Sequence, residues 1–168
     1  QHSIKSLKAH NFLPLKKLLF FSAVILAMHA CNTIDVYEKT QPFNRHEWPG
    51  NNKPSFMFTI TDTAALYNIY AVIRHDDSYH FNNLWLNVTT MAPGDTAKIQ
   101  QVQLILGDNT KGWLGSAMDD IIEHRILLTR NPVALKKGAY TFTLQQIMRE
   151  DPLQNILNAG IRVEKATQ

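Results

Sequence analysis

The sequence predicts an all-β protein: an antiparallel β-sandwich, jelly-roll-like, with one or two short helical insertions. Three observations lead to this prediction. Short runs rich in aromatic and β-branched residues recur along the chain, most of them alternate between apolar and polar positions, and turn residues separate them. A regular alternation of strand and helix patterns is missing, so a doubly wound parallel sheet is not expected.

The first expected elements lie between residues 32 and 60. Residues 32–37 can begin a strand, and residues 41–54 are expected to form a loop because prolines and asparagines are frequent there. Trp48 lies within this loop, where a tryptophan usually packs back over the edge of a core. Residues 55–60 alternate between phenylalanine or isoleucine and other types, which indicates a strand.

Three longer strands are expected in the middle of the chain, at residues 67–74, 84–89 and 100–106. The first is rich in aromatic and β-branched residues at nearly every position, as in a strand that is buried on both faces. The second alternates cleanly and indicates one buried face. Pro93-Gly94-Asp95 and Gly107-Asp108-Asn109 supply the turns.

Residues 112–126 break the strand pattern. Their apolar residues are spaced three and four apart, which predicts a short helix or helical turn. A second helical turn is expected from Asp151-Pro152 through Leu157. The remaining strands are expected at residues 126–128, 140–145 and 161–163.

The first 31 residues have the layout of a bacterial lipoprotein signal peptide. Four lysines precede an apolar run from Leu18 to Ala30, which ends at Cys31, the single cysteine of the chain. The run is shorter than the about 20 residues of a membrane-spanning helix, so cleavage and lipidation of Cys31 are expected. Met28 and His29 are unusual before such a cysteine, which leaves an uncleaved signal anchor or a secretory signal with a free thiol as alternatives.

This signal sets the expected domain organisation. Residues 1–30 form the signal peptide, residues 31–54 form the lipidated N-terminus, tether and first strand, and residues 55–168 form the β-sandwich; residues 31–168 make a single globular unit. The signal removes four lysines and no acidic residue, so the net charge of +3 reflects targeting and does not indicate nucleic-acid binding. The expected location is the cell envelope, on the outer membrane or the periplasmic face of the inner membrane, with the membrane contacted through the lipid.

Two clusters of polar residues are candidates for chemistry. The first contains Asp119, Asp120, Glu123 and His124, and on a helix Asp120 would share a face with Glu123 or His124. This cluster is either a metal or acid–base grouping or a solvated helix face, with Asp119 or Asp120 capping the helix or pairing with Arg125.

The second cluster joins His75, Asp76, Asp77 and His80 between two strands, as either a metal site or a polar loop. Neither a nucleophile elbow nor a phosphate-binding glycine loop is present, and a lipidated Cys31 leaves no thiol for catalysis or disulfides. We therefore assign no catalytic residue, metal or cofactor.

Several strings along the chain carry a family resemblance. The strongest runs from Gly112–Gly115 through Met118–Ile121 to Glu123–Arg125. With further strings in order before and after it, the chain resembles the gliding motility lipoprotein GldH family of the Bacteroidota. These further strings lie at residues 36–39, 66–70, 74–75, 83–87, 93–96, 140–144, 146–149 and 162–165.

The resemblance implies an envelope lipoprotein that supports cell movement over surfaces and acts alongside the gliding and type IX secretion machinery. The family has no assigned enzymatic activity, so we expect a structural or accessory protein with no small-molecule substrate. Residues 112–125 would then be a partner-docking element or a plug at one end of the sandwich. The candidate docking residues are Trp113, Met118, Asp119, Asp120, Glu123, His124 and Arg125.

Two other functions are considered. A carbohydrate-binding module would need at least two of Trp48, Tyr79, Trp85 and Trp113 exposed in one plane or groove. A metal-dependent hydrolase would need the side chains of the 119–124 cluster to converge on one point.

Overall fold

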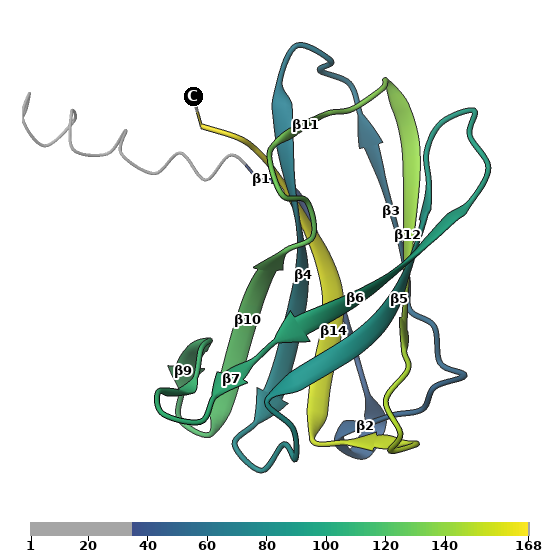
Figure 1. Cartoon of the computed structure of the whole chain (residues 1–168). Coiled ribbons are helices and arrows are strands. Elements are labelled where there is room, and N and C mark those ends of the chain that lie inside the picture. Colours follow the sequence, from purple (N-terminus) through teal and green to yellow (C-terminus); the bar gives the residue numbers. More distant parts are fainter. Residues whose placement is uncertain (1–34, 168) are drawn as a thin grey trace, which may run out of the picture. The chain divides into compact units, whose positions relative to one another are not determined.

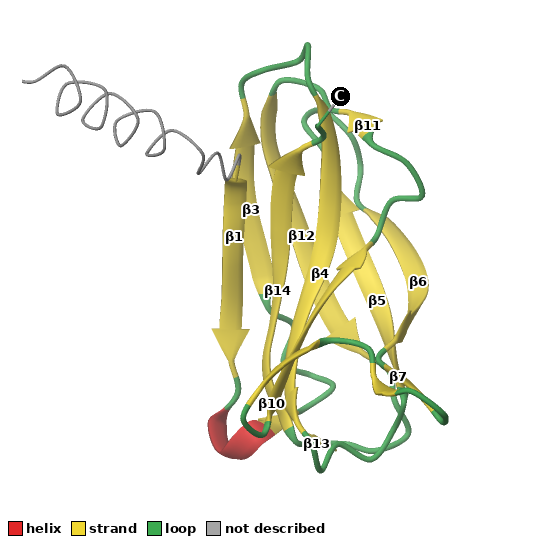
Figure 2. Ribbon diagram, turned by 90° about the vertical axis from the view of Figure 1, so that its left-hand side faces the viewer, coloured by secondary structure: helices red, strands yellow, loops and turns green. Residues whose placement is uncertain are grey.

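Two antiparallel sheets face each other across one hydrophobic core (Figures 1 and 2). This computed structural model describes residues 35–167, so the predicted signal peptide and Cys31 lie outside the described residues. No helix in the described part of the chain is long and apolar enough to span a membrane.

The first sheet contains six strands. In sheet order they are β1 (Asp35–Pro42), β14 (Ile156–Lys165), β4 (Leu66–Asp76), β10 (Ile121–Leu127) and β9 (Ser116–Met118), and the short β11 (Val133–Ala134) also pairs with β4.

The second sheet contains β3 (Ser55–Ile60), β12 (Gly138–Gln146), β5 (Asn83–Met91) and β6 (Lys98–Ile105), in that order. Two small ribbons complete the fold: β2 (Glu47–Trp48) pairs with β13 (Leu153–Gln154), and β7 (Gly107–Asp108) pairs with β8 (Gly112–Trp113). A 3-10 turn, η1 (Asn44–His46), links β1 to β2.

The strand order is that of a jelly roll, as the sequence predicts. Counting only the eight long strands along the chain, one sheet has the order first, eighth, third and sixth, and the other has the order second, seventh, fourth and fifth. Strands that are distant in sequence therefore lie side by side, and the N-terminal and C-terminal strands β1 and β14 pair along their lengths.

The alternating sequence pattern explains how the second sheet packs. In β3 and β12 every second side chain is buried, and the ring of Phe58 stacks on those of Tyr140 and Phe142 in the core at centroid distances of 5.6 and 5.7 Å. The central strand β4 also fits its prediction, because the consecutive residues Ala71, Val72 and Ile73 are all fully buried.

Residues between the expected first strand and residue 54 are built into the sandwich. Strand β1 pairs with β14 from Asp35 to Pro42. Trp48 is fully buried, stacks on Phe43 at a centroid distance of 4.8 Å, and donates its indole N–H to the carbonyl oxygen of Asn52 at 2.8 Å. The loop tryptophan is therefore a core residue.

Both predicted helical insertions are wrong. Residues 112–126 form β8, β9 and most of β10, and residues 151–157 contain a cis Asp151-Pro152 bond, β13 and the start of β14. The apolar spacing of three and four residues arises because short strands succeed one another, each with its own period of two. In β10, for example, Ile122 and His124 point inward while Ile121 and Glu123 face outward.

Candidate functional site

The segment that the family resemblance singles out crosses one end of the sandwich. Its β8 ribbon leads into the β9–β10 hairpin, which turns at Asp119 and Asp120. Gly112 has a φ of +76°, and Gly115 lies so close to β10 that a Cβ there would be 2.4 Å from the carbonyl oxygen of Glu123. Both glycines are therefore required by the path of the chain around Trp113.

The inner side of this segment contains a buried pair of histidines. His75 on β4 and His124 on β10 stack at a centroid distance of 5.0 Å, and their Nε2 atoms are 2.9 Å apart. The ring of Trp113 meets His75 edge-on at 4.4 Å. The half-buried Trp113 thus lies against the histidine pair at this end of the core.

Hydrogen bonding defines the tautomers of this pair. His75 Nδ1 lies 2.6 Å from the carbonyl oxygen of Asp76, which can only accept, so the Nδ1 atom carries the proton. In the neutral ring Nε2 of His75 is then an acceptor, and His124 donates its Nε2–H to it. Burial lowers the pKa of His75, and burial together with the nearby His75 ring lowers the pKa of His124 to about 4.

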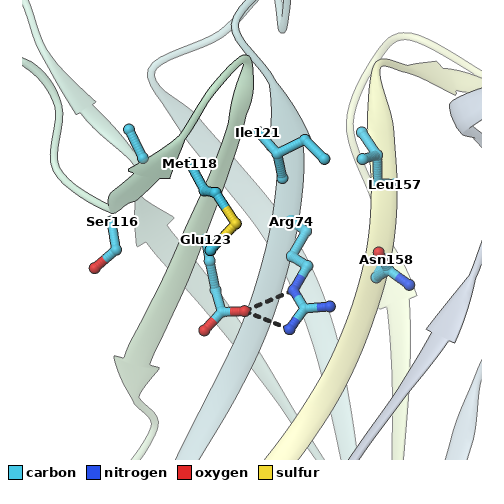
Figure 3. A pocket seen from close by; sticks show the side chains of 8 residues that line it. Arg74, Ser116, Met118, Ile121, Glu123, Leu157 and Asn158 are labelled. Atoms are coloured by element: carbon cyan, nitrogen blue, oxygen red, sulfur yellow. Dashed lines mark hydrogen bonds and ion pairs between the residues drawn. The ribbon is translucent and has the colours of Figure 1, made fainter.

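The outer side of the same segment carries a pocket of about 360 Å³ (Figure 3). Met118 and Ile121 form its apolar wall, and Arg74 and Glu123 pair in it, with Arg74 Nε donating to Glu123 Oε2 at 2.6 Å. The remaining lining residues are Ser116, Ala117, Leu157 and Asn158.

A chain of ion pairs extends from this pocket across the outer face of the first sheet. Glu123 also accepts from Arg125 Nε at 3.0 Å, and Arg125 reaches Glu38 on β1 at 3.5 Å. Glu38 contacts Arg162, which bonds Glu164 at 3.0 Å. Each charged side chain in this row of ion pairs lies beside one of opposite charge, so the row as a whole carries no net charge.

The structure does not bring the Asp119, Asp120, Glu123 and His124 cluster together. Asp119 and Asp120 are exposed in the hairpin turn, and Glu123 and His124 point to opposite faces because they are successive residues of one strand. The convergence that a metal-dependent hydrolase requires is therefore missing in this cluster. Residues 35–167 contain no group of three histidine, cysteine, aspartate or glutamate residues that could hold a metal ion.

The second polar cluster also separates. His75 is buried beside His124, whereas His80 is exposed and lies 3.2 Å from Glu150. Asp76 faces His46 at 3.6 Å, and the backbone N–H of Asp77 bonds the carbonyl oxygen of Asp120 at 3.1 Å. These residues connect the loop to its neighbours.

The aromatic residues considered for carbohydrate binding do not form an exposed platform. Trp48 and Tyr79 are buried at 0% and 4% exposure, and Trp113 lies against His75. Trp85 alone among the four is exposed, at 37%, on the outer face of the second sheet. The requirement for two exposed rings in one plane is not met.

Two interactions at this site were missed by the sequence reasoning. Arg74 with Glu123, and His75 with His124, are pairs 49 residues apart that meet because β4 and β10 are antiparallel neighbours. The signal that could have found them is the Arg-His order in one strand and the Glu-His order in the other. With Arg74 opposite Glu123, both histidines fall on the inner face, diagonally across the two strands.

Comparison with known proteins settles the family. Residues 35–163 match the GldH lipoprotein family. The chain belongs to this family. It is 23% identical to the gliding motility lipoprotein GldH homolog of Christiangramia forsetii over 156 residues, which cover 89% of this chain and 95% of that protein. It is also 23% identical to the gliding motility lipoprotein GldH of Flavobacterium johnsoniae over 155 residues, covering 88% and 94%.

Membership of this lipoprotein family makes the chain a lipid-anchored protein of the cell envelope. No solved structure matches the fold significantly. The family match spans both sheets, from the first residue of β1 to Val163 in β14, so residues 112–125 and the strands beside them all lie within it.

Proposed function

We propose that this GldH-family lipoprotein supports gliding motility as a non-catalytic adaptor, and that its β9–β10 hairpin binds another envelope protein of the gliding and type IX secretion machinery. Both relatives are named as gliding motility lipoproteins, which supports the motility role. Residues of the hairpin and of the pocket beside it would make the contact.

The observation that carries this proposal is the exposure of Met118 at the wall of the outer pocket. Its side chain is 78% exposed, and Ile121 beside it is 38% exposed. An unbranched methionine adapts its shape to a partner surface, which suits a docking contact. Because Arg74 and Glu123 neutralise each other in the pocket, the side chain that enters it should be apolar and uncharged.

The inner side of the segment supports this contact mechanically. Trp113 and the two histidines fix β8 and β10 to β4, so the exposed hairpin projects from a rigid base. A rigid docking element loses little conformational entropy on binding. The plug and docking interpretations are thus compatible, with Trp113 and His124 on the inside and Met118, Asp119, Asp120 and Arg125 on the outside.

Site-specific photocrosslinking in intact cells tests the proposal. A photoreactive residue at Asp120, which is exposed in the hairpin turn, should crosslink to a gliding or secretion component. Met118→Asp in the same background should abolish both that adduct and cell spreading. The matched control is Met57, which is 67% exposed on β3 of the other sheet. If Met118→Asp and Met57→Asp cells spread equally well and give the same adducts, the hairpin is not the docking element.

A further inference from the structure

Strand β6 forms an exposed edge of the second sheet. Among the described strands it has β5 as a neighbour on one side only, and its residues are exposed over nearly the whole strand. Ile99 and Ile105 are 71% and 50% exposed. From Ile99 to Ile105 the strand has no charge and no proline, although these are the usual devices that keep exposed edges from pairing.

Strand β1, the long edge strand of the first sheet, has features that prevent a further strand from pairing with it. Strand β1 contains Glu38, Lys39 and Pro42, and its pairing with β14 has an irregularity between Asp35 and Tyr37. Charges, proline and a bulge all discourage a further strand from adding there. Beyond its first residue, strand β6 lacks these protective features.

The hydrogen-bond pattern identifies which backbone groups of β6 are free to pair. Leu106 donates its N–H to Asn82 at 2.8 Å, on the β5 side. Because successive residues of an antiparallel strand alternate between its two edges, the even-numbered residues of β6 face β5 and the odd-numbered ones face outward. The outward N–H and C=O groups belong to Ile99, Gln101, Gln103 and Ile105.

The sequence of this edge is nearly palindromic. It reads Ile-Gln-Gln-Val-Gln-Leu-Ile from residue 99 to residue 105, centred on Val102. If two copies meet antiparallel about Val102, Ile99 lies opposite Ile105 of the second copy and Gln101 opposite its Gln103. The backbone groups of these residues point away from β5, and their side chains lie on the face of the sheet that is turned away from the core. Each hydrogen-bonded pair of the two copies would therefore bring two isoleucines or two glutamines together.

We propose that β6 pairs with β6 of a second copy of this chain, which joins the two second sheets into one continuous sheet across a two-fold axis at Val102. Antiparallel edge pairing is isologous, so the dimer closes and leaves no β6 edge for further growth. The outward residues of β5 and β12 are uncharged as well, so no charge on this face repels the second copy. They are Trp85, Asn87, Thr89, Met91, Ala139, Thr141, Thr143 and Gln145.

Lipid anchoring makes such a contact effective. A single edge strand buries less surface than a stable dimer in solution needs. Two copies held on one membrane meet at a high effective concentration, which favours a weak two-fold contact. The dimer therefore belongs to the anchored protein, and it does not depend on what the β9–β10 hairpin binds.

Cysteine crosslinking of the full-length protein in its own membrane tests the proposal. In the proposed register Val102 lies opposite Val102 of the second copy in a non-hydrogen-bonded pair, where side chains are close enough for a disulfide. Under mild oxidant, Val102→Cys should give roughly tenfold or more dimer than Met57→Cys, an exposed position on the opposite edge strand β3. The wild-type chain, which carries neither introduced cysteine, gives the background.

Charge substitutions then test the register. In the Val102→Cys background, Gln101→Glu with Gln103→Glu places like charges opposite each other and should lower crosslinking roughly fivefold. Gln101→Lys with Gln103→Glu places opposite charges together at both pairs and should restore it. These side chains are exposed, and circular dichroism checks that every variant is folded.

Val102→Cys crosslinking that matches the Met57→Cys level overturns the proposal, as does a double-Glu variant that crosslinks like its Lys–Glu counterpart. Disulfides of Val102→Cys to a different protein also overturn it. Loss of spreading in Met118→Asp cells with normal Val102→Cys dimers would separate the hairpin function from dimerisation.

Discussion

The buried His75–His124 pair predicts that acidification below about pH 7 destabilises this protein. The folded state keeps His124 neutral, since burial lowers its pKa from 6.5 to about 4, whereas the unfolded chain binds a proton near pH 6.5. Between these values the unfolded state binds more protons, so the free energy of unfolding falls as the pH falls. The loss stops near pH 4, where the folded state also binds the proton.

The magnitude follows from the shift. Each pKa unit corresponds to about 1.4 kcal/mol, so His124 removes about 2 kcal/mol of stability between pH 7.5 and pH 5 and about 3 kcal/mol in total. His75, whose pKa is lowered in the same direction by burial, adds to the loss. His75 is the titratable group that faces His124 from β4, and the uncharged Trp113 covers the pair from β8.

Urea unfolding at a series of pH values measures this effect. The variant His124→Gln removes the titrating ring and retains an amide that can donate to His75, so its free energy of unfolding should depend less on pH between 7.5 and 5. The exposed His46 and His80, which lie near Asp76 and Glu150, are unchanged in the variant and cancel in the comparison. Equal pH dependence of the two proteins, or a His124 NMR titration midpoint near 6.5, would refute the reasoning.

Three further substitutions test the site. Gly115→Ala should lower the free energy of unfolding by about 2 kcal/mol, because the new Cβ would collide with the carbonyl oxygen of Glu123. The control is Gly94→Ala, whose Cβ would contact no other residue and would strain only the backbone of its turn. Chemical denaturation measures both variants. Glu123→Gln should cost about 1 kcal/mol, and the difference from wild type should shrink in high salt, because Glu123 and Arg74 are partly exposed. Met118→Ser should change the melting temperature very little, since its side chain is exposed, and a large drop would show that Met118 supports the fold.

Sequence periodicity predicted the strands in which buried and more exposed residues alternate. The expected strands at residues 84–89 and 140–145 lie within β5 and β12, and their apolar residues are the buried ones. The same reasoning failed at residues 112–126, because β8 and β9 contain only two and three residues and are too short to show a period of two. Their apolar residues merge into a spacing that imitates a helix.

The composition of the site could not be predicted for a different reason. The residues at 112–125 were identified from the family resemblance, but which of them face the core depends on the register between β4 and β10. That register places His124 inside and Glu123 outside, and a shift by one residue would exchange them. The partners of both residues come from β4, 49 positions away, and follow only from the jelly-roll order.

The direction of strand β1 has a mechanical consequence. Asp35 at its start lies four positions after Cys31 and pairs with Glu164, whereas Pro42 at its other end pairs with Asn158, a residue of the Met118 pocket. A pull between the start of β1 and the hairpin therefore acts along the strands. The ladder between β1 and β14 is then loaded in shear, with its hydrogen bonds resisting together, because these bonds run perpendicular to the strands.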